Sequence, residues 1–348
     1  MECLTLKEAM LYRVENSIVN CYLCSRYCKI SPGQLGFCRV RENLNGKLYT
    51  LVYDKVVSAN PDPIQKKPLF HFAPGTMAFS IATPGCNFRC DFCCNWVISQ
   101  SRNIVGENIP PEQLVEMAKS SGCQGMSYTY TEPTIFFELA YETAKIAHQE
   151  NLYNMFVTNG YMTPEAVDTI SPYLNAVTVD FKGSGNTDFY RKHCQVFDVE
   201  PIYKTLEACK EKKIFIEITN LVIPEIGEYK DDFKKLCRWI VEKIGEETPL
   251  HLLAFHPNYK ITDISATPVR LIDESISIAE SEGLKHVYSG NIPGHKNENT
   301  YCPRCGNMVI ERYSIFLREN KLKKGVCPYC GYKLNVVEWP RSSDPVSA

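Results

Sequence analysis

A regular alternation of strand-like and helix-like segments between residues 77 and 290 is the feature that most constrains the fold. Strand-like runs occupy residues 77–83, 125–131, 154–159, 176–181, 214–223, 250–255 and 286–290. Helix-like segments begin near residues 110, 135, 164, 201, 230 and 271. Strands that alternate with helices of about ten or more residues form parallel β/α units with right-handed crossovers. We therefore predict an α/β fold, a full or partial (β/α) TIM-like barrel, with a doubly wound sheet as the alternative.

Polar and sulfur-bearing residues stand where the predicted strands end. In parallel β/α folds, the reactive groups lie at the C-terminal ends of the strands. The residues in such positions, taken strand by strand, are Cys86, Glu132, Asn159, the pair Asp180 and Lys182, and His256. We expect these side chains to meet at one edge of the sheet.

Cysteine is unusually frequent: the chain has 17, and most of them fall into three tight groups. A disulfide framework suits short secreted domains, whereas C-x2-C pairs in a long cytosolic chain more often bind metal. The first residues lack a basic start followed by an apolar core, and no apolar run approaches the roughly 18 residues of a membrane span. We therefore expect a cytoplasmic protein without membrane contact, whose cysteine groups bind metal.

The middle group, Cys86, Cys90 and Cys93, has the spacing C-x3-C-x2-C within "TPGCNFRCDFC". Structural metal sites normally take four protein ligands, so either a distant residue supplies the fourth or one position stays open. A four-iron cluster held by three thiolates would keep one iron free of protein ligands. Adjacent residues rarely face the same cluster, so we expect Cys94 to lie beside the site instead of completing it.

Each flanking group can complete a site by itself. The last group has the spacing C-x2-C-x21-C-x2-C, and a glycine follows each pair; its members are Cys302, Cys305, Cys327 and Cys330. This pattern predicts a zinc ribbon or rubredoxin-like site, structural with zinc and electron-carrying with iron. The first group has the spacing C-x2-C-x3-C-x9-C; its members are Cys21, Cys24, Cys28 and Cys38. Its thiolates suit zinc or an auxiliary iron–sulfur cluster, and we slightly favour zinc.

These patterns divide the chain into three predicted units. Residues 1–65 form an N-terminal cysteine-rich domain, residues 66–296 the β/α barrel, and residues 297–348 the C-terminal ribbon. The formal net charge of −2 offers no basic surface for nucleic acid, so we expect no such partner and give a zinc-dependent nucleic-acid binder little weight.

The three-cysteine loop resembles the signature of the radical S-adenosylmethionine (SAM) superfamily, because it follows the first strand and has Phe92 before its last cysteine. With "CYLCSRYCKISPGQLGFCRVREN", "DPIQKKPLFHF" and "GCNFRCDFCCNW", the resemblance narrows to the radical SAM enzyme of the AmmeMemoRadiSam system. That branch is related to pyruvate formate-lyase activating enzyme. The resemblance covers nearly the whole chain, and Cys94 departs from the glutamine usual in the family.

The resemblance implies a [4Fe-4S] cluster on Cys86, Cys90 and Cys93, with SAM bound at the open iron. Reductive cleavage of SAM would give a 5′-deoxyadenosyl radical that abstracts hydrogen from an unknown substrate, for which a protein is the expected class. The electron would come from a donor such as flavodoxin or ferredoxin. The protein would bind and orient these groups and exclude water.

The resemblance also assigns SAM contacts. "YTYTEP" implies Thr131 and Glu132, "VTNG" implies Asn159, "VDFKG" implies Asp180 and Lys182, and "FHPNY" implies His256. The alternative for Asp180 and Lys182 is an ion pair with a structural role, and the alternative for His256 is a structural histidine.

Two other functions compete with this one. A narrower version is a glycyl-radical-enzyme activating enzyme. A different class is an iron–sulfur electron-transfer or scaffold protein that does not cleave SAM, against which the presence of Glu132 and Asn159 argues.

Overall fold

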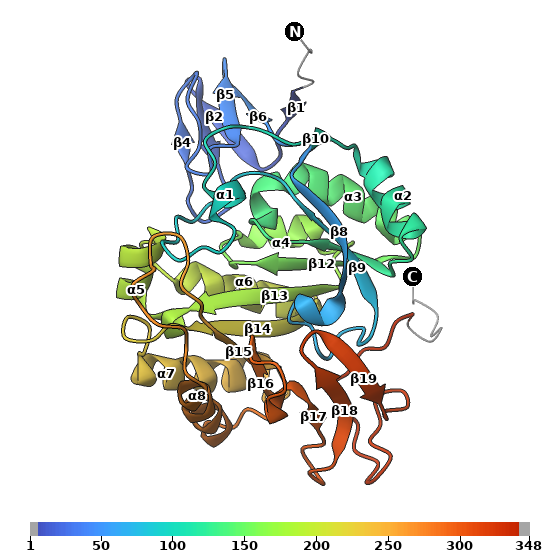
Figure 1. Ribbon diagram of the computed structural model, residues 1–348. Coiled ribbons are helices and arrows are strands. Elements are labelled where there is room, and N and C mark those ends of the chain that lie inside the picture. The colour runs from blue at the N-terminus through green and yellow to red at the C-terminus, as the bar shows by residue number, and fades with distance from the viewer. Residues whose placement is uncertain (1–5, 341–348) are drawn as a thin grey trace.

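The computed structural model describes residues 6–340, and an eight-stranded sheet forms its core (Figure 1). The strands run in the order β16-β15-β14-β13-β12-β11-β9-β8, and all neighbours from β9 to β16 pair in parallel. Their bounds are β8 (Ser58–Pro63), β9 (Met77–Ala82), β11 (Gly125–Tyr128), β12 (Tyr153–Thr158), β13 (Ala176–Lys182), β14 (Phe215–Val222), β15 (Leu250–Ala254) and β16 (Val287–Gly290). Apolar, almost fully buried strands are typical of parallel sheets covered on both faces.

The order of the strands distinguishes the two predicted architectures. A doubly wound sheet reverses its strand order at a switch point, whereas here each parallel strand lies beside its neighbour in the sequence. Strands β8 and β16 form the two edges of the sheet. The barrel is therefore partial, and the predicted α/β fold is confirmed in its partial form.

Helices connect the parallel strands, as the sequence predicts. Their bounds are α1 (Trp96–Ser99), α2 (Pro111–Ser120), α3 (Phe137–Gln149), α4 (Pro164–Ile170), α5 (Thr187–Cys194), α6 (Glu200–Glu211), α7 (Lys230–Trp239) and α8 (Val269–Ser281). Single turns are η1 (Ile64–Lys66), η2 (Pro133–Phe136), η3 (Gly183–Gly185), the π-helical η4 (Ile240–Ile244) and η5 (Lys296–Glu298). Proline at the first turn of α2 and α4 fixes a helical φ where no amide hydrogen bond is lost. No helix within residues 6–340 is long and apolar enough to span a membrane.

The N-terminal unit consists of small antiparallel sheets above the C-terminal ends of the main strands (Figure 1). Its strands are β1 (Lys7–Glu8), β2 (Tyr12–Glu15), β3 (Ile18–Cys21), β4 (Lys29–Ile30), β5 (Arg41–Leu44), β6 (Lys47–Thr50) and β7 (Lys55–Val56), the last paired with β10 (Glu107–Asn108). Inside the molecule, Arg41 of β5 forms a buried ion pair with Glu138 of α3. This pair joins the unit to the first helical layer of the barrel.

The C-terminal unit is a three-stranded sheet of β17 (Thr300–Tyr301), β18 (Met308–Tyr313) and β19 (Phe316–Asn320), drawn in red in Figure 1. Arg312 donates from Nη2 to Phe70 O at 2.7 Å. Trp339 packs edge-on against Tyr153, the first residue of β12, so this part of the chain covers the N-terminal ends of the main strands. The two cysteine-containing units therefore contact different ends of the barrel.

Two elements differ from the sequence-based expectation. Residues 58–63, placed within the N-terminal unit by the prediction, form β8, the antiparallel edge strand of the main sheet. Helix α5 follows β13 where no helix is expected. The domain boundaries themselves stay predictions.

Candidate active site and cysteine centres

A cavity of about 320 Å³ lies at the C-terminal ends of the main strands. Its volume is in the range of small-molecule sites. Its lining includes predicted residues from four successive strand ends, namely Cys86, Cys90, Cys93, Thr131, Glu132, Asn159, Asp180 and Lys182. Cys94 also lines this cavity, beside the predicted ligands. The structure thus brings together the predicted site residues of the first four strands.

The cysteine loop is held on both sides by backbone contacts. Gly85 has φ +100°, and a Cβ there would come within 2.6 Å of Val40 Cγ1, so the close approach of the N-terminal unit requires glycine. On the other side, Arg89 N donates to Cys194 O at 3.0 Å and Asp91 N donates to His193 O at 2.9 Å. Helix α5, which the sequence prediction missed, therefore anchors the loop through the carbonyl groups of its last turn.

The three loop cysteines are poor thiolates without a metal. Burial raises the pKa of Cys86, and the nearby Glu132 adds to the shift. Burial and the charge of Cys90 raise the pKa of Cys93. A metal cluster supplies the positive charge that keeps such buried sulfurs deprotonated. The sulfurs do not converge as ligands of one ion do, which fits attachment to different irons of a cluster.

Glu132 joins the ends of β11 and β12. Its Oε1 accepts hydrogen bonds from Thr134 N at 3.1 Å and from Thr158 Oγ1 at 2.7 Å, and its Oε2 accepts one from Asn159 N at 2.8 Å. Burial raises the pKa of Glu132, and these donors oppose the shift. Because a carboxylate has about four acceptor positions, Oε2 keeps capacity for one further donor, such as an ammonium group in the cavity.

Asn159 connects the end of β12 to the cysteine loop. Its Nδ2 donates to Asn87 Oδ1 at 2.7 Å and lies 4.0 Å from Cys86 Sγ. Its Oδ1 accepts from Tyr161 N at 3.0 Å, which fixes the orientation of the amide. The side chain is therefore positioned at the cluster loop itself.

Asp180 and Lys182 form the ion pair considered as the structural alternative. Lys182 Nζ lies 3.8 Å from Asp180 Oδ2, and Thr219 Oγ1 donates to Asp180 Oδ1 at 2.6 Å. Burial disfavours the charged form of Lys182, but the charges of Asp180 and Cys90 outweigh it and raise the pKa of the ammonium group. Both residues line the cavity, so pairing and ligand contact are compatible.

His256 is not brought into this cavity. Strand β15 ends at Ala254, and the His256 side chain is exposed and absent from the residues that line the cavity. Its predicted SAM contact rests on the resemblance alone.

Two further residues of the cavity wall, Lys67 and Tyr130, contact Asp62, and the sequence did not indicate this group of side chains. Lys67 Nζ lies 2.8 Å from Asp62 Oδ2, and the hydroxyl group of Tyr130 donates to the same carboxylate. Burial lowers the pKa of Lys67 to about 8 against the opposing effect of Asp62. Asp62 belongs to β8 and Lys67 to the connection that follows it, which sequence patterns did not place in the sheet. A second cavity, of about 250 Å³, shares wall residues with the first and extends it to the β18–β19 turn at Ser314.

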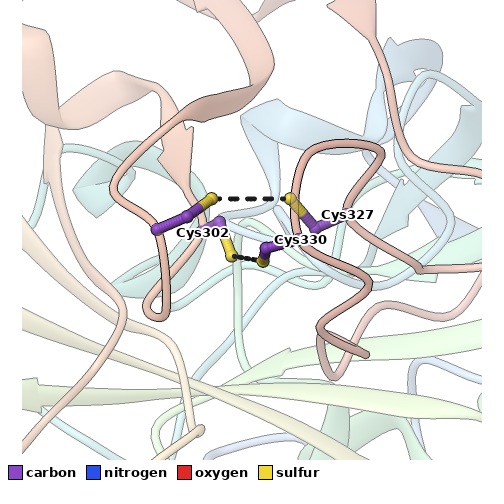
Figure 2. A group of neighbouring side chains, drawn as sticks. Cys302, Cys327 and Cys330 are labelled. Atoms are coloured by element: carbon purple, nitrogen blue, oxygen red, sulfur yellow. Dashed lines mark hydrogen bonds between the residues drawn. The ribbon is translucent and has the colours of Figure 1, made fainter.

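The C-terminal cysteines form a compact four-sulfur cage (Figure 2). Cys302 Sγ lies 3.5 Å from Cys330 Sγ, and Cys305 Sγ lies 3.8 Å from Cys327 Sγ. All four sulfurs are within 4.8 Å of one another. Thiolates about 2.3 Å from a tetrahedral zinc ion are about 3.8 Å apart. The cage thus fits a single ion. Hydrogen bonds from Asn307 lower the pKa of Cys305 to about 6.

Comparison with known proteins gives a match over most of the residues that line the cavity. A model of the radical SAM superfamily matches residues 80–240. Uncharacterized protein MJ0808 of Methanocaldococcus jannaschii is 43% identical over 339 residues, which cover 95% of this chain and 100% of that protein. The same organism's Putative glycyl-radical enzyme activating enzyme MJ1632 is 24% identical over 163 residues, which cover 46% of this chain and 62% of that protein.

Among solved structures, a domain of the pyruvate-formate lyase-activating enzyme from Bacteroides vulgatus is similar, with a TM-score of 0.42 and 19% identity. The similarity covers 48% of this chain and 99% of that domain. The superfamily match includes the three-cysteine loop and the four strand ends around the cavity. Together with a relative that matches almost the entire chain, it shows that this protein belongs to the radical SAM superfamily.

Proposed function

We propose that this protein cleaves SAM reductively and uses the resulting radical to abstract hydrogen from an organic substrate. Membership in the superfamily implies a [4Fe-4S] cluster and SAM as cofactors. The observation that carries the proposal is the cavity that combines the three loop cysteines with polar residues from three further strand ends. When bound, the cluster and SAM supply an electron and a 5′-deoxyadenosyl radical, the reactive species of the reaction.

The protein's own residues would bind and orient these groups. Cys86, Cys90 and Cys93 would hold the cluster, and the open coordination position would face the cavity. Asn159 and Glu132 would fix the loop and the β11 end, because each bridges two strand ends by hydrogen bonds. Buried walls would keep water and stray hydrogen donors away from the reacting atoms.

SAM would contact the polar rim of the cavity. We assign this role to five residues that line the cavity, namely Thr131, Glu132, Asn159, Asp180 and Lys182. The free capacity of Glu132 Oε2 suits the amino group of the methionine part. The Asp180–Lys182 pair offers a charge of each sign close to Cys90.

The substrate class is proposed by analogy. We place the chain in the AmmeMemoRadiSam branch and expect a protein or peptide substrate, because related activating enzymes act on proteins. The second cavity would receive the reacting group of such a substrate. A cytoplasmic location and a flavodoxin or ferredoxin as electron donor complete the proposal.

The first experiment measures 5′-deoxyadenosine after anaerobic reconstitution with iron and sulfide, reduction, and addition of SAM. The wild-type protein should form the nucleoside, whereas Cys90→Ala should lose the absorbance of the loop cluster and the product. Cys209→Ala is the matched control, since Cys209 is buried in α6, outside the residues that line the cavity. Product formation by Cys90→Ala would overturn the assignment of the loop.

Two alternative functions give different results in the same preparation. A glycyl-radical activating enzyme should generate a glycyl radical on a partner, detected by electron paramagnetic resonance. Repeated absence of this signal with active enzyme argues against that narrower function. An iron–sulfur scaffold or electron-transfer protein should bind its cluster but form no 5′-deoxyadenosine above background.

A further inference from the structure

The N-terminal cysteines form a buried set next to the catalytic loop. Cys21 is the last residue of β3 and lies beside Cys28, because Cys21 N donates to Cys28 O at 2.9 Å. Cys21, Cys24 and Cys38 are buried, and Cys28 is half-buried. All four are free thiols. Four cysteines in one small unit are a ligand set that both zinc and iron–sulfur clusters take.

The spacing of these sulfurs differs from that of the C-terminal cage. Within residues 6–340, only the C-terminal cysteines converge closely enough to surround one metal ion. Neither the N-terminal sulfurs nor those of the catalytic loop, for which the superfamily implies a four-iron cluster, form such a converging group. Thiolates that bind different irons of a cluster do not need to converge on one point. This difference from the C-terminal cage favours a cluster over zinc.

Hydrogen-bond donors surround the N-terminal sulfurs. Phe37 N donates to Cys28 Sγ at 3.5 Å, and Arg41 Nη1 donates to Cys21 Sγ at 3.4 Å. Arg41 is only 1% exposed, and its Nε has no acceptor among the residues that the structure describes. Hydrogen bonds to sulfur tune the potential of iron–sulfur clusters, and the sulfide ions of a cluster would provide the acceptor that this buried guanidinium lacks.

Short contacts connect this set to the catalytic loop. Arg89 of the loop donates to Phe37 O with Nη2 and to Cys86 O with Nη1, the latter at 2.6 Å. Arg26 Nε donates to Asn87 O at 2.9 Å. Phe37, whose amide donates to Cys28 Sγ, is therefore linked to Arg89 by one hydrogen bond, and Arg89 is linked to the carbonyl group of Cys86 by a second.

We propose that Cys21, Cys24, Cys28 and Cys38 hold a second iron–sulfur cluster, which the Phe37–Arg89 contacts place beside the cluster of the catalytic loop. This inference goes beyond SAM cleavage and does not depend on it. It replaces the preference for zinc at this site. Arg41 is a positioning residue that stabilises the negative charge of the cluster.

The test counts iron, sulfide and zinc in anaerobically reconstituted variants. The triple variant Cys86→Ala, Cys90→Ala, Cys93→Ala should keep about four irons and about four sulfides per chain, held by the N-terminal set. Cys24→Ala with Cys38→Ala should lose about half of the wild-type iron and sulfide, whereas Cys209→Ala with Cys237→Ala should lose neither. Because the two cysteine sets are altered separately, misfolding of one variant leaves the other result decisive.

Either of two results would overturn the proposal. One is a triple variant that folds, by circular dichroism, but contains a second equivalent of zinc in place of iron and sulfide. The other is a Cys24→Ala, Cys38→Ala variant with wild-type iron and sulfide. As a second readout, Arg41→Gln should lower the midpoint potential of the cluster that the triple variant retains, because a cation beside it is removed. An unchanged potential would refute the role of Arg41.

Discussion

Gly85→Ala tests how closely the N-terminal unit packs against the catalytic loop. Gly85 has φ +100°, and the added Cβ would lie 2.6 Å from Val40 Cγ1 and 3.2 Å from Cys38 O. Positive φ costs an L-residue about 1–2 kcal/mol. Overpacking of a buried contact adds about 1–3 kcal/mol. The expected total loss in the free energy of unfolding is therefore about 2–5 kcal/mol.

Gly122→Ala is the matched control. Gly122 has φ +69°, and no atom lies within 4 Å of the position that its Cβ would take. This variant should show only the backbone term of about 1–2 kcal/mol. The difference between the two variants isolates the contact between Gly85 and the N-terminal unit.

The assay is urea unfolding followed by circular dichroism, with iron content measured in parallel. Gly85→Ala should unfold at lower urea and bind less iron, because the clash displaces the segment that leads into Cys86. Gly122→Ala should keep the iron content of the wild type. Equal stability losses and equal iron contents in both variants would refute the close packing.

Three further predictions address the cavity and the ribbon. Asp180→Asn should weaken SAM binding about tenfold in titration calorimetry, which is the loss expected for one hydrogen bond to a charged group. Asp188→Asn, on the exposed surface of α5, should leave the affinity unchanged. Equal affinities of the two variants would assign Asp180 a structural role. Lys67 has a pKa of about 8 in the folded protein and of 10.5 in the unfolded chain, so the unfolded chain binds more protons between these pH values and the stability of the wild type should rise with pH in that range. Urea unfolding at several pH values should show that Lys67→Met abolishes this rise. A rise that persists in the variant would contradict the lowered pKa of Lys67. Cys327→Ala should remove zinc but no iron in metal analysis, and loss of iron would show that the cage holds iron.

The sequence predicts the central sheet well for a physical reason. The parallel strands are buried on both faces, so they appear as apolar runs separated by amphipathic helices. The edge strand β8 lacks that signal, because "SANPDP" has prolines at 61 and 63 and reads as a connection. Proline is tolerated on an edge strand, where one side of the backbone needs no partner.

The sequence contains one weak indication of helix α5, which the prediction missed. Asn186 caps it, accepting a hydrogen bond from Phe189 N at 2.8 Å, which an N-cap search could have found. The segment is short and polar, so its hydrophobic periodicity does not stand out. Its importance comes from tertiary contacts with Arg89 and Asp91, which no local pattern encodes.

Some residues of the candidate site could be predicted from the sequence and others could not. The cysteines and the strand-end residues were predictable because their positions follow from strand order alone. His256 was expected on the same rule, but β15 ends two residues earlier, and the side chain is exposed and absent from the residues that line the cavity. Lys67 and its partner Asp62 could not be predicted, because the position of Lys67 in the cavity wall depends on the pairing of β8 with β9.

The most direct test of the central claim is electron–nuclear double resonance of the reduced protein with SAM labelled with nitrogen-15 at its amino group. To leave only the loop cluster, the measurement uses the Cys24→Ala, Cys38→Ala variant. We expect a nitrogen-15 coupling to the cluster that disappears when Cys90→Ala is added. A cluster spectrum unchanged by SAM, without any such coupling, would contradict it.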